Sequence, residues 1–377
     1  MSNLLEKLPA APGERYYPQL DGLRALAVAT VFIGHLIPLP LLQKIVGWGD
    51  IGVVLFFCLS GFLITGILLK IDCRELTGKA VAIRSFYVRR ALRIFPIYYL
   101  TIALAVAVGY GPVRVHLLRL VTYSLNVPGL PPTDNLWAVA HFWSLSVEEQ
   151  FYLFWPMVVL FFPRQFLRRF LVALIGLAFL YKLSLALVNA SYTLVFASLL
   201  GCLDSLGLGA LLAIGWSEAA SRAGTVRRWV RAGMAGGAVW VILTVVRIAV
   251  DMDANYAGYL WVGVVTFAAA AVAFTGLIAF AASGTQGLVG RFLENRFMVM
   301  VGRISYGLYV YHFFMRYILR WMVSRQYLHL SSLWNYAWLS ILMSAVAAVV
   351  SWHLIEKPIL RLKKYFNYGV PANATPA

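Results

Sequence analysis

Residues 50–69 read DIGVVLFFCLSGFLITGILL, a run in which Asp50 is the only charged residue. An α-helix rises 1.5 Å per residue, so about 20 apolar residues cross the hydrocarbon core of a bilayer. Similar runs recur along the chain. Hydrophobic residues make up 61% of the 377 residues and charged residues 12%, which leaves too little polar surface for a water-soluble protein of this length. The sequence therefore predicts an all-α, polytopic integral membrane bundle.

The apolar segments predict about ten transmembrane helices, in one membrane domain that covers residues 20–358. One further stretch, 113–127, is short for a bilayer and contains Arg114, His116 and Arg119. We interpret it as a surface or re-entrant helix rather than an eleventh span. The predicted spans are 20–41, 50–69, 90–110, 143–163, 166–188, 194–216, 232–250, 257–282, 304–323 and 334–356.

Lys and Arg are distributed unevenly between alternate loops. If the N-terminus is cytoplasmic, 23 of these residues lie in cytoplasmic segments and 4 in outer loops. Basic residues collect on the cytoplasmic side of membrane proteins, so both termini are predicted to be cytoplasmic, and the protein multi-pass in the inner (plasma) membrane. Topology then accounts for the net charge of +17, and no nucleic-acid partner is expected.

The two ends of the chain are expected to lie outside the bilayer. Residues 1–19 form a cytoplasmic segment without the apolar region of a cleavable signal, and residues 359–377 form a basic cytoplasmic tail whose last residues, VPANATPA, are expected to be disordered. The cysteines, Cys58, Cys73 and Cys202, show neither disulfide nor metal spacing. We therefore expect reduced thiols and no metal.

Ionisable side chains at membrane depth are costly, and each is a functional candidate. Asp21, Arg24 and His35 lie within about 40° of one face of the first predicted helix. Asp21 and His35 are separated by roughly 21 Å of helix rise. Asp21 is therefore expected to serve Arg24 at the cytoplasmic end, with His35 in the outer half. A packed or interfacial histidine is an equally open interpretation of His35.

Two adjacent carboxylates, Glu148 and Glu149, occur in the segment HFWSLSVEEQFYLFWP. With the predicted helix boundaries, Glu148 lies about 8 Å from the outer end of its span, a depth similar to that of His35. The two could meet in the outer leaflet, where a carboxylate would orient the imidazole and raise its basicity. The alternative is a buried polar pair that only fixes two helices together.

Three arginines, Arg89, Arg90 and Arg93, precede the third predicted span. Arg89 and Arg93 are one helical turn apart, and paired guanidinium groups suit phosphate ligands. The alternative is a membrane anchor that contacts lipid headgroups.

Less costly polar and small residues complete the candidates. Ser60 places a hydroxyl near mid-membrane, and His312 lies near the middle of its own span. The glycines of the second span and its start allow close approach of another helix, although such residues usually serve core packing. They are Gly49, Gly52, Gly61 and Gly66.

Several motifs, taken together and in order, resemble the acyltransferase 3 family of bacterial membrane O-acyltransferases. Each is weak alone, but the ordered set is specific and extends from residue 16 to residue 358. The motifs are YYPQLDGLRALAVATVFIGH, GDIGVVLFFCLSGFLIT, FYVRRALRIFPIYYL, HFWSLSVEEQFYLFWP, GRISYGLYVYH and SWHLIEKP.

The resemblance implies transfer of an acyl group, most often acetyl from cytoplasmic acetyl-CoA, to a hydroxyl of a carbohydrate acceptor. Such acceptors are a surface polysaccharide, a glycolipid or a related glycoside, and sometimes a macrolide. Functional positions carried over are Arg24, His35, Glu148 and the donor-site arginines Arg89, Arg90 and Arg93. Some members carry an added extracytoplasmic domain; here a separate extracytoplasmic partner could take its place.

One departure from the family pattern concerns Asp204. Many members carry an arginine two residues before this aspartate, where this chain has Cys202. Any substrate contact made by that arginine is in doubt here.

The mechanism expected from the resemblance uses His35 as general base, Glu148 to orient it, and the arginines to hold acyl-CoA. Asp21, Ser60, Glu149, Asp204 and His312 would support this site. The rival hypothesis is a transporter or flippase of a glycosylated or anionic lipid, because membrane histidines and carboxylates also suit proton coupling. Transporters often contain inverted repeats, and no repeat is visible in this sequence.

Overall fold

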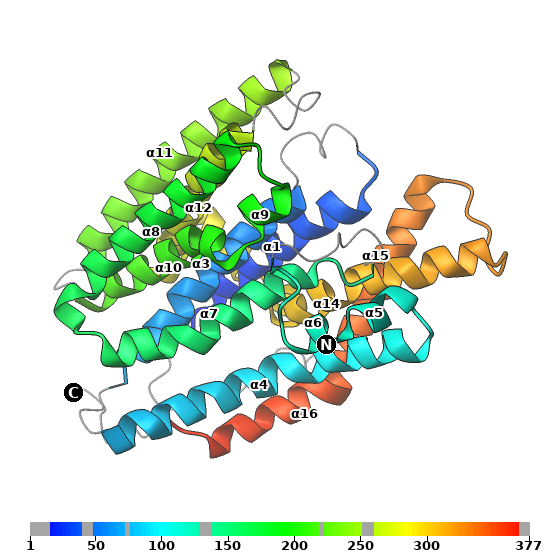
Figure 1. Cartoon of the computed structure of the whole chain (residues 1–377), viewed down its shortest axis with the longest axis horizontal. Helices are drawn as coiled ribbons and strands as arrows, with labels where there is room; N and C mark the ends of the chain where they lie inside the picture. The colour runs from blue at the N-terminus through cyan, green and yellow to red at the C-terminus, as the bar shows by residue number, and fades with distance from the viewer. Residues whose placement is uncertain are drawn as a thin grey trace.

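The computed structural model describes residues 16–39, 48–71, 76–127, 138–218, 222–250 and 260–368, and this part of the chain contains helices but no strands. Every predicted apolar segment overlaps a long helix, so the all-α fold is confirmed there. The long helices in Figure 1 are α1 (Pro18–Leu36), α3 (Trp48–Leu69), α4 (Leu76–Ala107), α7 (Phe142–Phe161), α8 (Arg164–Leu187), α10 (Leu199–Glu218), α11 (Arg222–Ala249), α12 (Leu260–Ala282), α14 (Arg296–Ser324) and α15 (Leu333–Ser351).

Within the described residues, 7 helical segments are long and apolar enough to cross a membrane. The protein is therefore multi-pass, while the count of ten spans and the direction of the termini remain predictions. The long helices outside this group are α1, α7 and α14. These three carry His35, Glu148 and His312, whereas Ser60, Asp204 and the arginines of α4 lie on helices of the apolar group.

The first helix ends earlier than the sequence predicted. α1 stops at Leu36 rather than at residue 41, because Ile37 is extended, with φ −83° and ψ 124°, and Pro38 follows it. Proline disfavours the helical conformation of the residue before it. As a result, His35 lies in the last turn of α1 instead of well inside the helix.

The ambiguous stretch near residue 113 forms two short helices, α5 (Gly111–Val115) and α6 (Leu117–Val121). Each has 5 residues, and neither can cross a bilayer. This agrees with the predicted surface or re-entrant segment. Cys73 and the end of the tail, residues 370–377, lie outside the described residues.

Helices α3 and α10 touch through their backbones. A Cβ atom on Gly61 would lie 2.0 Å from the carbonyl oxygen of Leu206, and one on Gly209 would lie 2.0 Å from that of Cys58. Only glycine permits this approach, which confirms the close contact predicted at Gly61. Gly66 has open space around its Cα, so the same prediction fails there.

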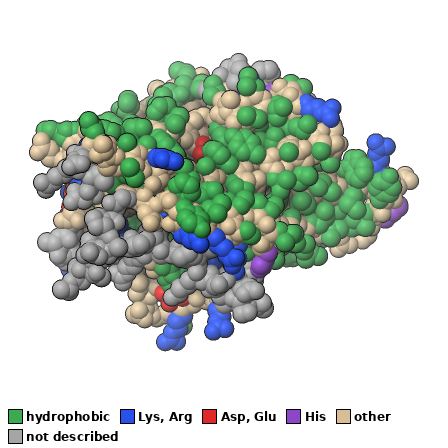
Figure 2. Space-filling model, turned by 90° about the horizontal axis from the view of Figure 1, so that it is seen from below, with side chains coloured by type: hydrophobic (Ala, Val, Ile, Leu, Met, Phe, Trp, Pro, Cys, Tyr) green, Lys and Arg blue, Asp and Glu red, His purple; other side chains and the backbone are tan. Residues whose placement is uncertain are grey.

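Successive long helices run in opposite directions through the bundle. The two ends of the bundle carry different polar residues. We call the "histidine end" the one where α1 ends and α3, α7 and α10 begin, and the "arginine end" the opposite one. Around the sides, α8 and α11 expose large apolar side chains such as Leu177 (64% exposed) and Ile242 (60%), as expected for lipid-facing helices. Hydrophobic side chains also cover much of the face in Figure 2.

Candidate active site

Three imidazoles from separate helices meet at the histidine end. His35 comes from the last turn of α1, His312 from the middle of α14, and His141 immediately precedes α7. The rings of His35 and His312 are stacked, with centroids 5.2 Å apart. The rings of His141 and His312 meet edge to face at 4.5 Å. His312 is 0% exposed and His141 is 3% exposed, so this cluster is enclosed by protein.

Hydrogen bonding fixes the neutral tautomers of the two stacked histidines. His312 Nδ1 lies 2.6 Å from the carbonyl oxygen of Tyr309, an acceptor, so Nδ1 must carry the proton. His312 Nε2 is then a lone pair, and His35 Nδ1 donates to it at 3.0 Å. This leaves His35 Nε2 unprotonated and without a partner among the described side chains. An imidazole held in this way can accept a proton at Nε2.

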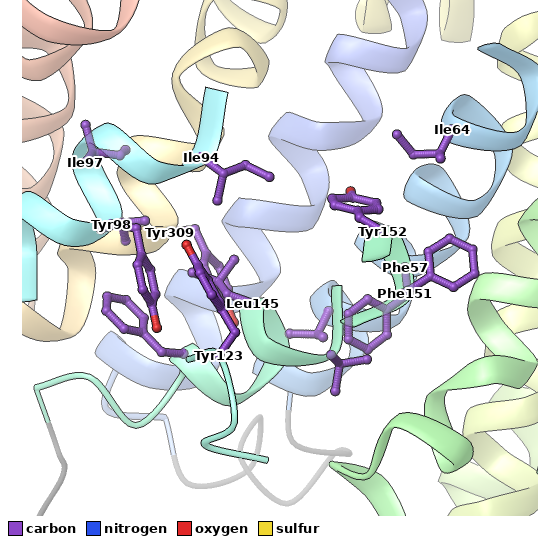
Figure 3. Close-up of a cluster of buried hydrophobic side chains, with 14 of the residues drawn as sticks. Phe57, Ile64, Ile94, Ile97, Tyr98, Tyr123, Leu145, Phe151, Tyr152 and Tyr309 are labelled. Atoms are coloured by element: carbon purple, nitrogen blue, oxygen red, sulfur yellow. The ribbon is translucent and has the colours of Figure 1, made fainter. Parts of the chain in front are cut away.

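Glu148 lies one helical turn or more below the histidines, on α7. One of its oxygens accepts hydrogen bonds from the hydroxyls of Ser60 on α3 and Tyr152 on α7. These hydroxyls are also 3.0 Å apart. Tyr152 belongs to the buried cluster drawn in Figure 3. Among the described residues, Glu148 forms no hydrogen bond with His35, so the pairing expected from the sequence is not formed.

The positions of His35 and Glu148 along their helices explain why the two do not pair. His35 is in the last turn of α1 because the helix ends at Leu36, whereas Glu148 lies seven positions into α7. At 1.5 Å per residue, the two differ in depth by roughly 8 Å or more. The neighbour that His35 has instead is His312, which the sequence suggested only as a second polar contact.

Ser144 and Tyr309 form hydrogen bonds with each other and with the carbonyl of His141, at the histidine side of Glu148. The Ser144 hydroxyl is 2.5 Å from that of Tyr309, and Tyr309 also donates to the carbonyl of His141 at 3.1 Å. Ser144, Glu148 and Tyr152 are spaced four residues apart, so they follow one face of α7. Polar groups therefore continue along α7 from the histidine end into the middle of the bundle.

Three guanidinium groups lie at the arginine end, beyond this row of polar groups. Arg24 pairs with Asp21 at 2.8 Å, as the sequence predicted. Arg90 lies over the rings of Phe86 and Tyr152, at 5.6 and 5.7 Å from their centroids. Arg93 is within electrostatic range of both Arg24 and Arg90, so three like charges gather below Glu148.

Arg89 faces a different direction from its neighbours. Its guanidinium donates to the backbone carbonyls of Lys363 and Phe366, at 3.2 and 3.1 Å, and lies over the ring of Tyr368. The side chain is 7% exposed. Arg89 therefore binds the C-terminal segment, and the structure separates it from the group formed by Arg24, Arg90 and Arg93.

Glu149, beside Glu148, is oriented differently. Its Oε1 atom is buried and has no hydrogen-bond partner among the described residues. The carboxylate is within electrostatic range of Arg90. The two adjacent glutamates thus have different surroundings, and Glu148 is the one in the row of hydroxyls.

Asp204 has a cation that the sequence analysis missed. Lys182, on α8, forms a buried ion pair with Asp204 on α10, and the two residues are 4% and 3% exposed. In the sequence, the sign of this cation was Lys182, a single lysine in the apolar run 166–188. A cation is therefore present beside Asp204 although residue 202 is a cysteine.

Other residues of the site were also missed. His141 is the first residue of the motif HFWSLSVEEQFYLFWP, and Tyr309 lies with His312 in GRISYGLYVYH. Neither was predicted to be a site residue. Arg316 donates to the carbonyl of His35, one turn after His312 on α14. Among the described residues, no group of three or more His, Cys, Asp or Glu side chains is arranged to hold a metal ion.

Comparison with known proteins places this architecture in a family. The chain is 27% identical over 374 residues to the O-acetyltransferase OatA of Staphylococcus aureus strain NCTC 8325, which covers 92% of this chain and 57% of that protein. It is 27% identical over 331 residues to a putative O-acetyltransferase of S. aureus strain COL, covering 79% of this chain and 50% of that protein.

The chain thus spans about half the length of these curated relatives. No solved structure matches it. A family model described as an acyltransferase domain matches residues 17–356, which include the histidine cluster, the Glu148 row and the three arginines. The chain therefore belongs to the acyltransferase 3 family.

Proposed function

We propose that the protein transfers an acetyl group from cytoplasmic acetyl-CoA to a hydroxyl of an envelope carbohydrate on the other side of the inner membrane. Family membership and the names of the relatives support an O-acetyltransferase. The observation that carries the proposal is the free Nε2 of His35, oriented through His312 at the histidine end. It provides a general base where an outer acceptor would arrive.

The arginine end supplies the donor site. Arg24, Arg90 and Arg93 lie together at this end, with Arg24 already paired to Asp21, and an anionic ligand is attracted to the guanidinium groups of Arg90 and Arg93. The phosphates of coenzyme A are such a ligand, and guanidinium groups bind them through paired donors. Arg89 acts here as the residue that holds the C-terminal segment beside this entrance.

The reaction uses His35 as base and then as acid. The acceptor hydroxyl gives its proton to His35 Nε2, and its oxygen attacks the thioester carbonyl. The C–S bond then breaks, and the leaving coenzyme A thiolate takes the proton from the imidazolium. His312 orients His35 in place of Glu148, and Glu148, Ser60 and Tyr152 lie between the two ends, where we propose that the pantetheine arm extends toward His35. General-base assistance of this kind contributes about 10²–10⁴ in rate.

The direct test is thioester consumption by the purified protein in nanodiscs. Acetyl-CoA is supplied with and without envelope glycan from a strain that lacks this gene, and free thiol is followed with a chromogenic disulfide. We expect thiol release that requires glycan and is lost in His35→Ala at equal protein. A protein that moved a lipid would release no thiol in either condition, and such a result would refute the proposal.

A further inference from the structure

A cavity at the histidine end lies apart from the three imidazoles. It is enclosed by α3, α8, α10, α12 and the short helix α9 (Tyr192–Phe196), with Trp143 of α7 at its wall. Its volume is about 30 Å³. A water needs roughly 10–15 Å³ on this measure, so the cavity takes a group the size of a hydroxymethyl arm and not a whole sugar ring.

Polar groups that line the cavity have unused hydrogen-bonding capacity. The ammonium group of Lys182 has three N–H donors and one bonded partner among the described residues, Asp204. Asp50 accepts from the hydroxyl of Tyr192 through one carboxylate oxygen, and its other oxygen has no bonded partner in the described part of the chain. Donors and an acceptor are thus available together, as a hydroxyl ligand requires.

The charges of the lining select against the donor. Asp50 and Asp204 contribute two carboxylates and Lys182 one ammonium, so the cavity repels phosphate groups and does not suit coenzyme A. The remaining wall is mostly apolar, with aliphatic and aromatic side chains, and Phe57 and Trp143 meet edge to face in it with centroids 6.3 Å apart. A mostly apolar wall with a few convergent polar groups is typical of small-molecule sites, and it fits an uncharged sugar.

The position of the cavity relates it to the proposed base. Trp143 lines it, and two residues earlier His141 contacts His312. Residues two apart project to different sides of a helix, and His35 lies beyond His141, in contact with His312, so the start of α7 lies between the cavity and the base. A sugar unit that places its hydroxymethyl arm in the cavity does not also present a hydroxyl to His35, whereas a second unit of the same chain can.

We propose that this cavity is an acceptor subsite, in which the side chains of Asp50, Tyr192 and Lys182 hold an uncharged hydroxymethyl or hydroxyl arm of an oligosaccharide. Another unit of the same oligosaccharide then presents its hydroxyl to His35. The inference rests on the proposed function, and it adds to that function where the acceptor binds and which acceptors fit.

The test separates binding of the acceptor from binding of the donor. Asp50→Asn replaces one acceptor oxygen of a carboxylate with a donor amide, Tyr192→Phe removes a hydroxyl, and Cys202→Met fills the cavity from its wall. Tyr181→Phe, which deletes a phenol next to Lys182 without lining the cavity, is the matched control. The protein in nanodiscs is assayed with labelled acetyl-CoA and the glycan described above, and coenzyme A binding is measured separately by calorimetry.

Asp50→Asn and Tyr192→Phe are expected to raise the apparent KM for glycan by about tenfold or more, the effect of weakening one hydrogen bond to a charged group, and Cys202→Met is expected to raise it by excluding the arm from the cavity. Their affinity for coenzyme A stays at the wild-type value, and Tyr181→Phe changes neither quantity. Unchanged glycan KM in all three variants, or a loss that follows coenzyme A affinity, would overturn the subsite. Failure of the wild-type protein to transfer acetyl at all would instead refute the proposed function.

Discussion

His35 and His312 form a pair in which each ring determines the protonation of the other. The carbonyl of Tyr309 requires a donor, so His312 presents a lone pair to His35. Partners of this kind, beyond the reacting group, fix the tautomer and ring orientation of the histidines they contact. In this protein His35 is oriented by His312 on α14, and not by Glu148 on α7 as expected.

Replacement of His312 separates its role as a hydrogen-bond acceptor from its role in packing. His312→Gln offers an oxygen to His35 Nδ1, whereas His312→Phe fills the space without an acceptor. We expect His312→Phe to lower kcat by about 10–100-fold and His312→Gln to recover much of that loss, with KM for acetyl-CoA unchanged in both. Steady-state kinetics at equal protein level measure this. Equal loss in the two variants would indicate that His312 only packs.

The arginines give a second comparison between side chains. Arg93 lies with Arg24 and Arg90, but Arg89 is bound to the C-terminal segment. We expect Arg93→Gln to raise KM for acetyl-CoA by roughly tenfold or more, since each charge-assisted bond to phosphate contributes about 1.5–3 kcal/mol. Arg89→Gln is the control and should affect thermal stability more than KM. The reverse pattern would assign the donor to Arg89.

The candidate site residues were largely predictable from the sequence, but their partners were not. Ionisable residues in apolar runs are visible without a structure, and His35 and Glu148 were found in this way, whereas Asp204 came from the family resemblance. Contacts depend on where each helix ends, and a shift of five residues in α1 separated His35 from Glu148. Lys182 was missed because its partner lies on another helix, and sequence spacing does not reveal that pairing.

For helices too, the sequence predicted the elements but not which of them are in contact. The glycines of α3 predicted a close neighbour, but only the structure identifies it as α10 and shows that Gly61 is used while Gly66 is not. The existence and order of the helices followed from hydrophobic runs. Their ends depended on local features, such as Pro38 after α1.

The contact between α3 and α10 predicts a clear effect on stability. In Gly209→Ala the new methyl group would lie 2.0 Å from the carbonyl oxygen of Cys58, so the helices must separate. We expect a loss of about 1–3 kcal/mol, as for overpacked cores, seen as a lower Tm in detergent. Gly66→Ala, with open space around it, should leave the Tm unchanged or higher. A Gly209→Ala variant as stable as Gly66→Ala would contradict the backbone contact.

The whole molecule is a bundle with different chemistry at its two ends. Arginines gather at one end, histidines and the acceptor cavity at the other, and a row of hydroxyls with Glu148 lies between them. Composition predicted the membrane bundle, and the distribution of Lys and Arg predicts that the arginine end is cytoplasmic. Such an arrangement lets donor and acceptor approach from opposite sides of the membrane.

The most direct test of transfer across the membrane uses sealed vesicles of known orientation, with glycan on the side of the histidine end. Labelled acetyl-CoA is supplied only to the face that carries the arginine end, and label on the glycan at the histidine end is counted. We predict glycan acetylation in this arrangement, no acetylation when acetyl-CoA is supplied only to the opposite face, and none with His35→Ala in either. Acetylation by His35→Ala at the wild-type rate, or equal acetylation from both faces, would contradict this account.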